Sequence, residues 1–461
     1  MAPAGPRSKR PRTSPEQPAS TTAPLAATSP ESARAPLAIR FIHPPKLANR
    51  SRVLAGRLVI GRDPECDIVL DDETISRRHA ELERAGSALA IRDLHSKNGL
   101  FCDGMRCELS PLELGRVVRL GDCVALICAQ VPGDLGLTEV APQLLGSHAL
   151  AQVVEQAQRA ARSNATVLLH GETGTGKELF ARLIHDASGR SGPFVAVNCA
   201  ALPETLIEAE LFGHERGAFT GAERARPGLI REAASGTLFL DEVAELPLPT
   251  QAKLLRVLEG HEVLPLGRAQ PIAVDLRVVC ASHADLPALV AAGAFRGDLY
   301  ARIEGVTLRL PPLRERRQDI LELFLRLVER YRPGPRPSLS ASFVEGLCAH
   351  DWPRNVRQLR QLAERLSVLL RTQSEWRRRD LLAALPELAA HSPSAAPPVK
   401  SSKPARALSR DELLAALQGA QGNVTVAAKR LAISKQTLYK HVAAHAIDLA
   451  EVRPAERPPL D

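Results

Sequence analysis

The segment TVLLHGETGTGKE, residues 166–178, constrains the fold of this chain more than any other stretch. An apolar run typical of a buried strand leads directly into three glycines, and a helical pattern follows Lys177. Glycines at such a turn let backbone N–H groups close around phosphate oxygens, while the following helix and the lysine supply positive charge. The segment therefore predicts a nucleoside triphosphate site. Its expected contacts are Gly171, Glu172, Thr173, Gly174, Thr175, Gly176, Lys177 and Glu178.

Glu178 departs from the general form of this motif, in which Ser or Thr after the lysine binds magnesium. A carboxylate at that position can reach a magnesium ion directly or through water, and both roles stay open.

A second apolar strand, GTLFLDE, ends in Asp241 and Glu242. At the carboxyl edge of a parallel sheet, beside a phosphate loop, Asp241 is expected to bind magnesium and Glu242 to orient the attacking water. Two acids after a strand are, on their own, also typical of a solvated turn. Together with the glycine loop they favour hydrolysis of the nucleotide.

The spacing of apolar residues along the chain predicts a multidomain protein. Short alternating segments over residues 37–131 predict a small all-β sandwich. Residues 143–313 alternate apolar strands with helical patterns, which predicts an α/β core around a parallel sheet. Helical patterns predict an almost wholly helical segment over residues 314–390 and a compact all-α unit over residues 408–450.

Composition adds weaker constraints. The 461 residues suit about three domains of roughly 150 residues each. Residues 1–36 and 391–407 are rich in Pro, Ser and Ala and predict a disordered tail and a linker. The net charge of +8 indicates either a polyanionic partner or evenly spread solvating charge. No apolar run is long enough to cross a bilayer, so we expect a cytoplasmic protein without membrane contact.

The eight cysteines favour reduced core thiols over a metal site. Cys102 and Cys107, like Cys123 and Cys128, would lie on opposite faces if each stretch were one strand.

Ordered motifs over roughly residues 143–390 resemble the AAA+ bacterial enhancer-binding proteins, which are transcription activators that work with sigma-54 RNA polymerase. The motifs are GETGTGKE, VNCAAL, ELFGHERGAFTGA, GTLFLDE, LRVVCAS, FRGDLYARI, LPPLRERRQDI and WPRNVRQL. Glu178 after the lysine is usual in this family. The resemblance implies ATP and Mg²⁺ as cofactors, an ATPase with a helical lid, a homo-oligomeric ring that is most often a hexamer, and sigma-54 RNA polymerase holoenzyme and enhancer DNA as partners.

The GAFTGA segment is close to diagnostic for that family, where it forms a loop tip that ATP drives against sigma-54. A run of small residues carrying one aromatic side chain is otherwise hard to explain, although a flexible surface loop is the simple alternative. The resemblance assigns the sigma-54 contact to Gly217, Ala218, Phe219, Thr220, Gly221 and Ala222.

Four further residues take expected roles from the resemblance. Asn198 matches the residue that couples the catalytic glutamate to the loop, and Arg296 and Arg302 match arginine fingers that reach the neighbouring subunit's γ-phosphate. Arg357 matches the sensor arginine of the lid. Three positions depart from the family: His283 replaces a usual Asn, Ala301 a usual Tyr and Ser235 a usual Gly.

The predicted sandwich resembles a forkhead-associated (FHA) domain, a phosphothreonine-binding module, through GRDPECDIVLDDETISRRHAELE and IRDLHSKNGLFCDG. Arg62 and Ser76 are expected to hold the phosphate, Arg77 to add positive potential and Asn98 to grip the peptide backbone. His79 is expected to support the loop from inside. The implied partner is a phosphothreonine-containing protein, and the alternative is a sandwich whose phosphate site has decayed.

The last unit resembles a Fis-type helix-turn-helix. Ser434 can cap its final helix, and the residues expected to face DNA are Lys435, Gln436, Thr437 and Lys440. A small helical dimerisation unit is the alternative.

Taken together, these features predict an ATP-hydrolysing, sigma-54-dependent activator whose FHA domain senses phosphothreonine and whose helix-turn-helix selects the DNA site. An AAA+ machine acting on another protein is the enzymatic alternative. A DNA-binding scaffold with a silent ATPase is the alternative outside enzymes.

Overall fold

The computed structural model describes residues 36–48, 50–85, 88–129, 138–141, 144–146, 148–390 and 410–420, with 427 and 431. The chain forms two compact units, Met1–Ser392 and Pro393–Asp461. The expected DNA contacts Lys435, Gln436, Thr437 and Lys440, the linker over 391–407 and all but the last residue of the expected tail lie outside the described residues.

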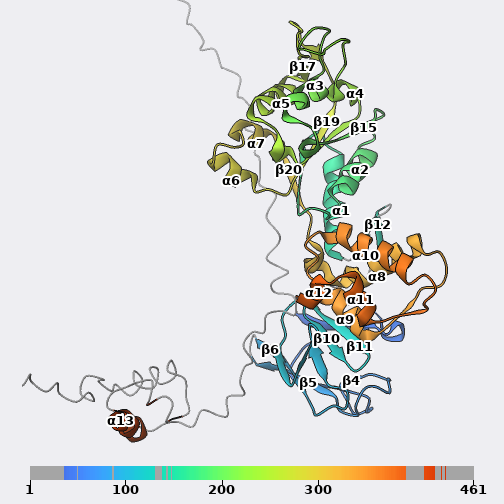
Figure 1. The fold of residues 1–461 in the computed structure, drawn as a ribbon, viewed down its shortest axis with the longest axis vertical. Helices are drawn as coiled ribbons and strands as arrows, with labels where there is room; N and C mark the ends of the chain where they lie inside the picture. The colour runs from blue at the N-terminus through green and yellow to red at the C-terminus, as the bar shows by residue number, and fades with distance from the viewer. Residues whose placement is uncertain are drawn as a thin grey trace, which may run out of the picture. The chain divides into compact units, whose positions relative to one another are not determined.

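The N-terminal domain is a β-sandwich of two sheets (Figure 1). One sheet has the order β2-β1-β11-β10-β7-β8 and the other β4-β3-β5-β6-β9. Ile39, Ile60 and Ile91 fill the core shared by the two sheets. The last strand, β11, is buried along almost its whole length. The strands are β1 (Leu37–His43), β2 (Ser51–Val53), β3 (Leu58–Gly61), β4 (Ile68–Val69), β5 (Ala80–Ala85), β6 (Ala88–Asp93), β7 (Leu100–Cys102), β8 (Met105–Cys107), β9 (Leu109–Pro111), β10 (Val117–Leu120) and β11 (Cys123–Ala129).

The central domain is an α/β core around a parallel sheet of order β15-β16-β19-β14-β20. Strand β16 shows why its sequence is a continuous apolar run: Leu238 and Leu240 face one buried cluster while Phe239 faces another. The strands are β14 (Val167–His170), β15 (Phe194–Asn198), β16 (Thr237–Asp241), β19 (Arg277–Ser282) and β20 (Val306–Arg309), and the short hairpins are β12 (Thr138–Ala141) with β13 (Leu144–Gly146) and β17 (Glu262–Val263) with β18 (Ile272–Ala273).

Helices cover both faces of this sheet (Figure 1). They are α1 (His148–Ala161), α2 (Lys177–Ser188), α3 (Glu204–Phe212), α4 (Leu229–Glu232), α5 (Leu248–Gly260), α6 (Leu286–Ala291) and α7 (Gly297–Ile303).

The lid follows as a helical domain around Phe324, Phe343, Trp352 and Trp376, all fully buried. Its elements are η4 (Leu313–Asp319), α8 (Ile320–Tyr331), β21 (Ser338–Leu339), α9 (Ala341–Ala349), α10 (Asn355–Leu369), β22 (Glu375–Trp376), α11 (Arg378–Ala384) and α12 (Glu387–Ala390). In the second unit, α13 (Arg410–Gly419) is described and buries Leu413 and Leu417.

All eight cysteines are free thiols. The expectation for Cys102 and Cys107 was wrong because the stretch is a hairpin rather than one strand: a tight turn at Asp103 and Gly104 joins β7 to β8. The neighbouring Cys107 thiol and burial both raise the pKa of Cys102. Among the described residues, no helix combines the length and the apolar character needed to cross a membrane.

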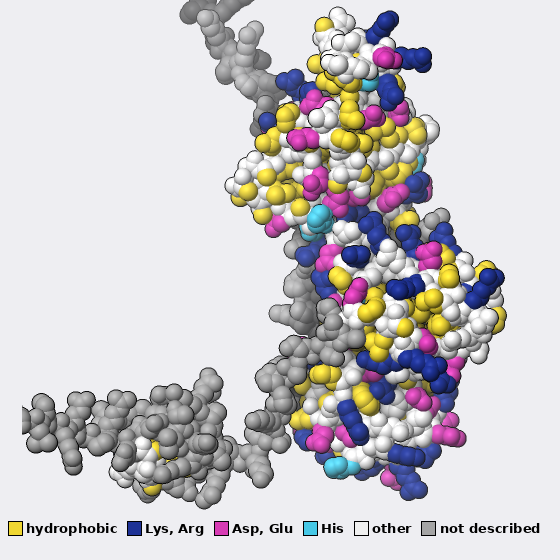
Figure 2. Space-filling model, viewed as in Figure 1, with side chains coloured by type: hydrophobic (Ala, Val, Ile, Leu, Met, Phe, Trp, Pro, Cys, Tyr) yellow, Lys and Arg dark blue, Asp and Glu magenta, His cyan; other side chains and the backbone are white. Residues whose placement is uncertain are grey.

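Basic and acidic side chains are interspersed on the face of the first unit drawn in Figure 2. On that face the described charges do not gather into a single basic patch.

Candidate active site

The phosphate loop lies between the end of β14 at His170 and the start of α2 at Lys177. Gly174 has φ +81°, and a Cβ there would lie 2.3 Å from the carbonyl oxygen of Arg354, so only glycine fits. Thr175 Oγ1 donates to the carbonyl of Glu172 at 2.8 Å and Lys177 Nζ to the carbonyl of Gly171 at 2.9 Å. These two bonds hold the loop in shape, and the buried Lys177 ammonium is bonded to its backbone.

The acids predicted for catalysis stand at the neighbouring strand end. Asp241 ends β16, and burial raises its pKa while the charge of Lys177 opposes that shift. Glu242 follows in a left-handed conformation, with one carboxylate oxygen 3.7 Å from Lys177 Nζ. The sheet therefore brings Lys177, Asp241 and Glu242 together, as the sequence predicts.

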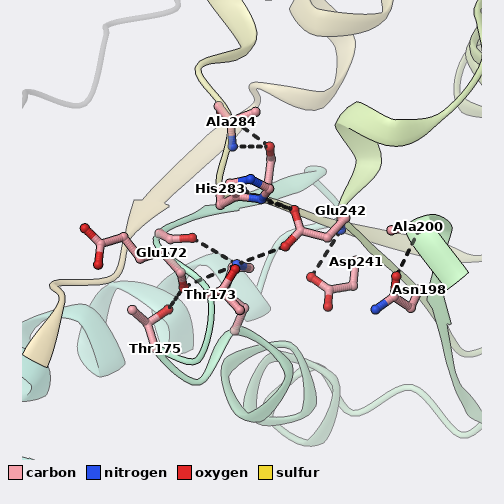
Figure 3. A network of polar contacts seen from close by, with 12 residues as sticks. Glu172, Thr173, Thr175, Asn198, Ala200, Asp241, Glu242, His283 and Ala284 are labelled. Carbon is pink, nitrogen blue, oxygen red and sulfur yellow. Dashed lines mark hydrogen bonds and ion pairs between the residues drawn. The ribbon is translucent and has the colours of Figure 1, made fainter. Parts of the chain in front are cut away.

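His283 is a functional candidate that sequence reasoning noted only as a departure from the family. Its Nδ1 donates to the second carboxylate oxygen of Glu242 at 2.6 Å, as the dashed lines in Figure 3 show. The reason is topological: β19 lies beside β16, so the residue after Ser282 meets the residue after Asp241. In the sequence, the available signal was that His283 directly follows an apolar strand. This signal could not pair His283 with Glu242, because the order of strands in a sheet cannot be read from local sequence.

Asn198 also lies at this edge, because it is paired with Asp241 across β15 and β16. Its side-chain oxygen accepts a bond from the Ala200 N–H at 3.0 Å, which caps the short helix η2 (Cys199–Ala201). The hydrogen bond to the Glu242 side chain comes instead from His283. Coupling of Glu242 to the loop by Asn198 stays a prediction.

The lid contacts the phosphate loop through residues that the sequence reasoning did not select. Asn355 Nδ2 donates to the Glu172 carboxylate and to the Thr173 carbonyl, both at 3.1 Å. Arg314 forms two hydrogen bonds with Glu172, at 2.6 and 2.9 Å. The Glu172 side chain is therefore held by the lid, and contact between a nucleotide and the Glu172 backbone stays a prediction. No local pattern marks these contacts, since they join segments far apart in the chain.

The other two residues that are expected to contact the nucleotide, Arg357 and Glu178, lie in the first turns of helices. Arg357 is exposed on α10, and a Cβ on Gly174 would come within 3.0 Å of the Arg357 Cβ, so this arginine stands over the phosphate loop. Glu178, in the first turn of α2, is exposed and lies 3.6 Å from Arg182.

The GAFTGA segment forms a loop with an anchored base and an exposed tip. At the base, His214 pairs with Arg226 and Leu266, and Gly217 N–H donates to the Ala222 carbonyl at 2.8 Å. Ala222 is buried, whereas Thr220 is exposed and Phe219 is 38% exposed, its ring edge-on to His214 at 5.0 Å. Gly217 and Gly221 have φ of +80° and +97° with open space around them. The glycines thus bend the backbone sharply on both sides of an accessible aromatic residue.

Both predicted finger arginines are exposed near α7. The Arg296 guanidinium pairs with Asp298 at 2.7 Å, and Arg302 donates to the Leu258 carbonyl at 2.9 Å. Ala301 is exposed between them. Ser235 has φ +59°, a left-handed conformation that glycine adopts without penalty and other residues at a cost of about 1–2 kcal/mol.

The predicted phosphopeptide residues gather on the loops at one end of the sandwich. Ser76 Oγ accepts from the Lys97 N–H at 3.0 Å, and Asn98 Nδ2 donates to the Thr74 carbonyl at 2.7 Å. Arg62 and Arg77 are exposed, and the backbone N–H of Arg62 donates to the Ser76 carbonyl at 3.0 Å.

His79 joins these loops from below. It is fully buried; Nδ1 accepts from the Ser76 N–H at 3.2 Å and Nε2 faces the Gly99 carbonyl at 3.2 Å. Burial lowers its pKa, which favours the neutral ring that this pairing requires. The loops are therefore tied together around a neutral imidazole.

A glycine loop between β14 and α2, acids at the end of β16 and a helical lid over the loop define a P-loop ATPase of the AAA+ class. Residues 144–309 match the family described as "Sigma-54 interaction domain", and residues 314–397 match "AAA+ ATPase lid domain". The AAA+ segment of the chain, residues 144–397, matches the models of sigma-54-dependent transcriptional regulators and their lid. These matches confirm the resemblance drawn from the motifs.

Individual proteins show how far the likeness extends. The chain is 42% identical over 302 residues to the transcriptional regulatory protein GlrR of Escherichia coli, covering 64% of this chain and 66% of GlrR. The chain thus spans just under two thirds of that relative's length. The crystal structure of NtrX from Brucella abortus in complex with ATP is 32% identical, with a TM-score of 0.49, covering 65% of this chain and 69% of NtrX.

The sandwich has its own matches. Residues 41–131 match the family "Inner membrane component of T3SS, cytoplasmic domain". A solved FHA domain, from a structural and functional analysis of phosphothreonine-dependent FHA interactions, is 26% identical with a TM-score of 0.20, covering 21% of this chain and 98% of that domain.

Proposed function

We propose that this protein is an ATP-driven activator that remodels sigma-54 RNA polymerase at a promoter. Lys177 and the N–H groups of the phosphate loop bind the β and γ phosphates, Arg357 adds charge from the lid, and Glu242 orients the attacking water. Asp241 would hold Mg²⁺, and Glu178 would reach the ion directly or through water. A half-buried carboxylate with a raised pKa, facing one lysine, fits a site that gains from a cation. The ion would neutralise charge on the phosphate oxygens.

The observation that carries the proposal is the exposed tip of the GAFTGA loop. Phe219 keeps 38% of its surface accessible, although an isolated phenylalanine would gain from burial. The tip stands on two left-handed glycines, and the base is tied to the AAA+ core by backbone hydrogen bonds. Such a loop can press an apolar contact and the Thr220 hydroxyl against a partner, and the matched family names sigma-54 as that partner.

Replacing Thr220 by Ala tests this assignment. We expect the variant to hydrolyse ATP at close to the wild-type rate, because Thr220 is exposed outside the nucleotide site, and to lose open-complex formation by sigma-54 holoenzyme at a promoter. Both rates are measured on the full chain with the same ATP concentration. Thr205→Ala, an exposed threonine on α3, is the matched control and should open promoters normally. Equal opening by Thr220→Ala and wild type would show that the tip is not the sigma-54 contact.

In this proposal, the N-terminal sandwich and the C-terminal helix-turn-helix regulate the activator. The sandwich senses phosphothreonine, because Arg62, Ser76, Arg77 and Asn98 meet on loops tied together by His79. The C-terminal helix-turn-helix selects enhancer DNA, and the arginine fingers require a ring, with a hexamer as the expected assembly. The expected location is the cytoplasm, where promoter DNA lies.

Arg62→Ala tests the sensing step. Loss of a charge-assisted hydrogen bond to phosphate costs about 1.5–3 kcal/mol, so we expect binding of a degenerate phosphothreonine peptide library to weaken by roughly ten-fold or more. Fluorescence anisotropy of the full chain measures this, with the unphosphorylated library as reference. Arg92→Ala on β6, also exposed, should bind as wild type. Equal binding of the phosphorylated and unphosphorylated libraries would instead indicate a decayed phosphate site.

A further inference from the structure

The sandwich does more than carry the phosphopeptide loops: one of its sheets is packed against the lid. Val117, Val124 and Leu126, on β10 and β11, point away from the sandwich core and are buried in the same apolar cluster as Phe343, Val344 and Leu347 of α9. Figure 1 shows β10 and β11 beside α9. An apolar face covered in this way is a built interface, since exposing it would return large aliphatic surface to water.

A buried ion pair fixes the register of this interface. Glu345 on α9 is fully buried; one carboxylate oxygen accepts from Arg119 Nε at 2.6 Å and the other from the Gly104 N–H at 3.0 Å. The Arg119 guanidinium also lies 3.7 Å from the centre of the Phe101 ring. The sandwich thus donates hydrogen bonds to both oxygens of the buried Glu345 carboxylate. Separating the sandwich from the lid would leave this charge unpaired.

On the sandwich side, hydrogen bonds continue from Arg119 to the phosphopeptide loops. Arg119 Nη1 donates to the Gly121 carbonyl at 3.2 Å, and the next N–H, from Asp122, donates to Thr74 Oγ1 at 2.9 Å. The carbonyl of Thr74 accepts from Asn98 at 2.7 Å. Gly121 packs tightly on Thr74, because a Cβ there would lie 2.5 Å from Thr74 Oγ1.

On the lid side, η4 contacts the sandwich and the phosphate loop through adjacent residues. Arg317 donates to the Gly115 carbonyl of the sandwich at 3.3 Å and lies 3.6 Å from Asp103. Arg316, buried, donates to the Thr175 carbonyl of the phosphate loop at 3.3 Å. A displacement of η4 therefore acts on the sandwich and on the nucleotide site together.

We propose that this sandwich face is a docking surface for the lid of the same chain, and that it couples the phosphopeptide loops to the ATP site through Arg119–Glu345 and η4. The coupling rests on the proposed function, since it gives the FHA-like site its route to the ATPase. Coupling between two sites is reciprocal: whatever the phosphopeptide does to the nucleotide site, nucleotide does to the loops.

Reciprocity allows a test without any phosphopeptide. Hydrogen exchange is followed by mass spectrometry on the full chain with and without saturating ADP, over peptides spanning residues 72–76 and 96–99. Because coupling energies are typically 1–3 kcal/mol, we expect ADP to change exchange there by about five-fold or more in wild type. Glu345→Gln should abolish this response and leave the response of the phosphate loop itself intact.

Two further variants keep the test decisive. Arg119→Gln with Glu345→Gln removes both charges together and avoids an unpaired buried charge, so it should fold and also lose the response. Glu329→Gln, in an exposed ion pair on α8, is the matched control and should respond as wild type. No ADP response at the loops in wild type, or a full response in the double variant, would overturn the coupling. Failure of phosphothreonine binding would leave this result unchanged, so the two proposals fail separately.

Discussion

Replacing Glu242 by Gln stops ATP turnover while ATP still binds. The carboxylate stands between Lys177 and His283 at the strand edge, and the amide cannot accept a proton from water or orient it as strongly. Loss of a general base typically lowers the rate by about 10²–10⁴-fold, so we expect a fall in kcat of that order. Phosphate release measures turnover, and a fluorescent ATP analogue measures binding.

A matched control lies three residues away. Glu245 is exposed in η3 (Val243–Glu245), and Glu245→Gln should hydrolyse ATP as wild type does. Turnover by Glu242→Gln within a few-fold of wild type would remove Glu242 from the mechanism. Such a result would turn attention to Asp241 as the group that orients water.

Replacing Arg302 by Ala should produce the second large effect. We expect this arginine to contact the γ-phosphate of the nucleotide that a neighbouring subunit binds. A trans arginine contributes about 10³–10⁵-fold to the rate of phosphoryl transfer, so we expect Arg302→Ala to lose on the order of 10³-fold. In the chain itself Arg302 meets only a backbone carbonyl among the hydrogen bonds of the described residues, so its removal breaks no described ion pair. Arg330→Ala, exposed on α8, is the control.

Mixing variants separates a trans role from a local one. Lys177→Ala subunits cannot bind phosphate but keep Arg302, whereas Arg302→Ala subunits bind ATP but lack the finger. A mixture should regain part of the wild-type activity, because one kind of subunit supplies the arginine to the nucleotide held by the other. If mixtures remain as inactive as each variant alone, the finger does not act across subunits. The same scheme applied to Arg296→Ala decides whether both arginines act.

Local sequence patterns predicted the elements that carry the ATP site. Apolar runs such as β16 and the glycine loop before α2 have signatures within a dozen residues, because strand burial and turn geometry depend on near neighbours. The pairing of Glu242 with His283 depends on strand order, and Asn355 reaches Glu172 across 183 positions of the chain. Contacts of this kind come from tertiary packing, which no local period encodes.

The junction between sandwich and lid was equally out of reach of local patterns. Val117, Val124 and Leu126 read as ordinary strand residues, and nothing in their spacing separates a face buried in the sandwich from one buried by α9. Cys107 is a local example. A tight turn makes its stretch a hairpin, so Cys107 is paired with Leu100 on the neighbouring strand.

The position of Lys177 links two parts of the ATP site. Its ammonium donates to the Gly171 carbonyl at 2.9 Å and lies 3.7 Å from a Glu242 carboxylate oxygen. One side chain therefore connects the backbone of the phosphate loop with the acid at the end of β16, so a substitution at Lys177 alters the surroundings of Glu242 as well as the phosphate loop.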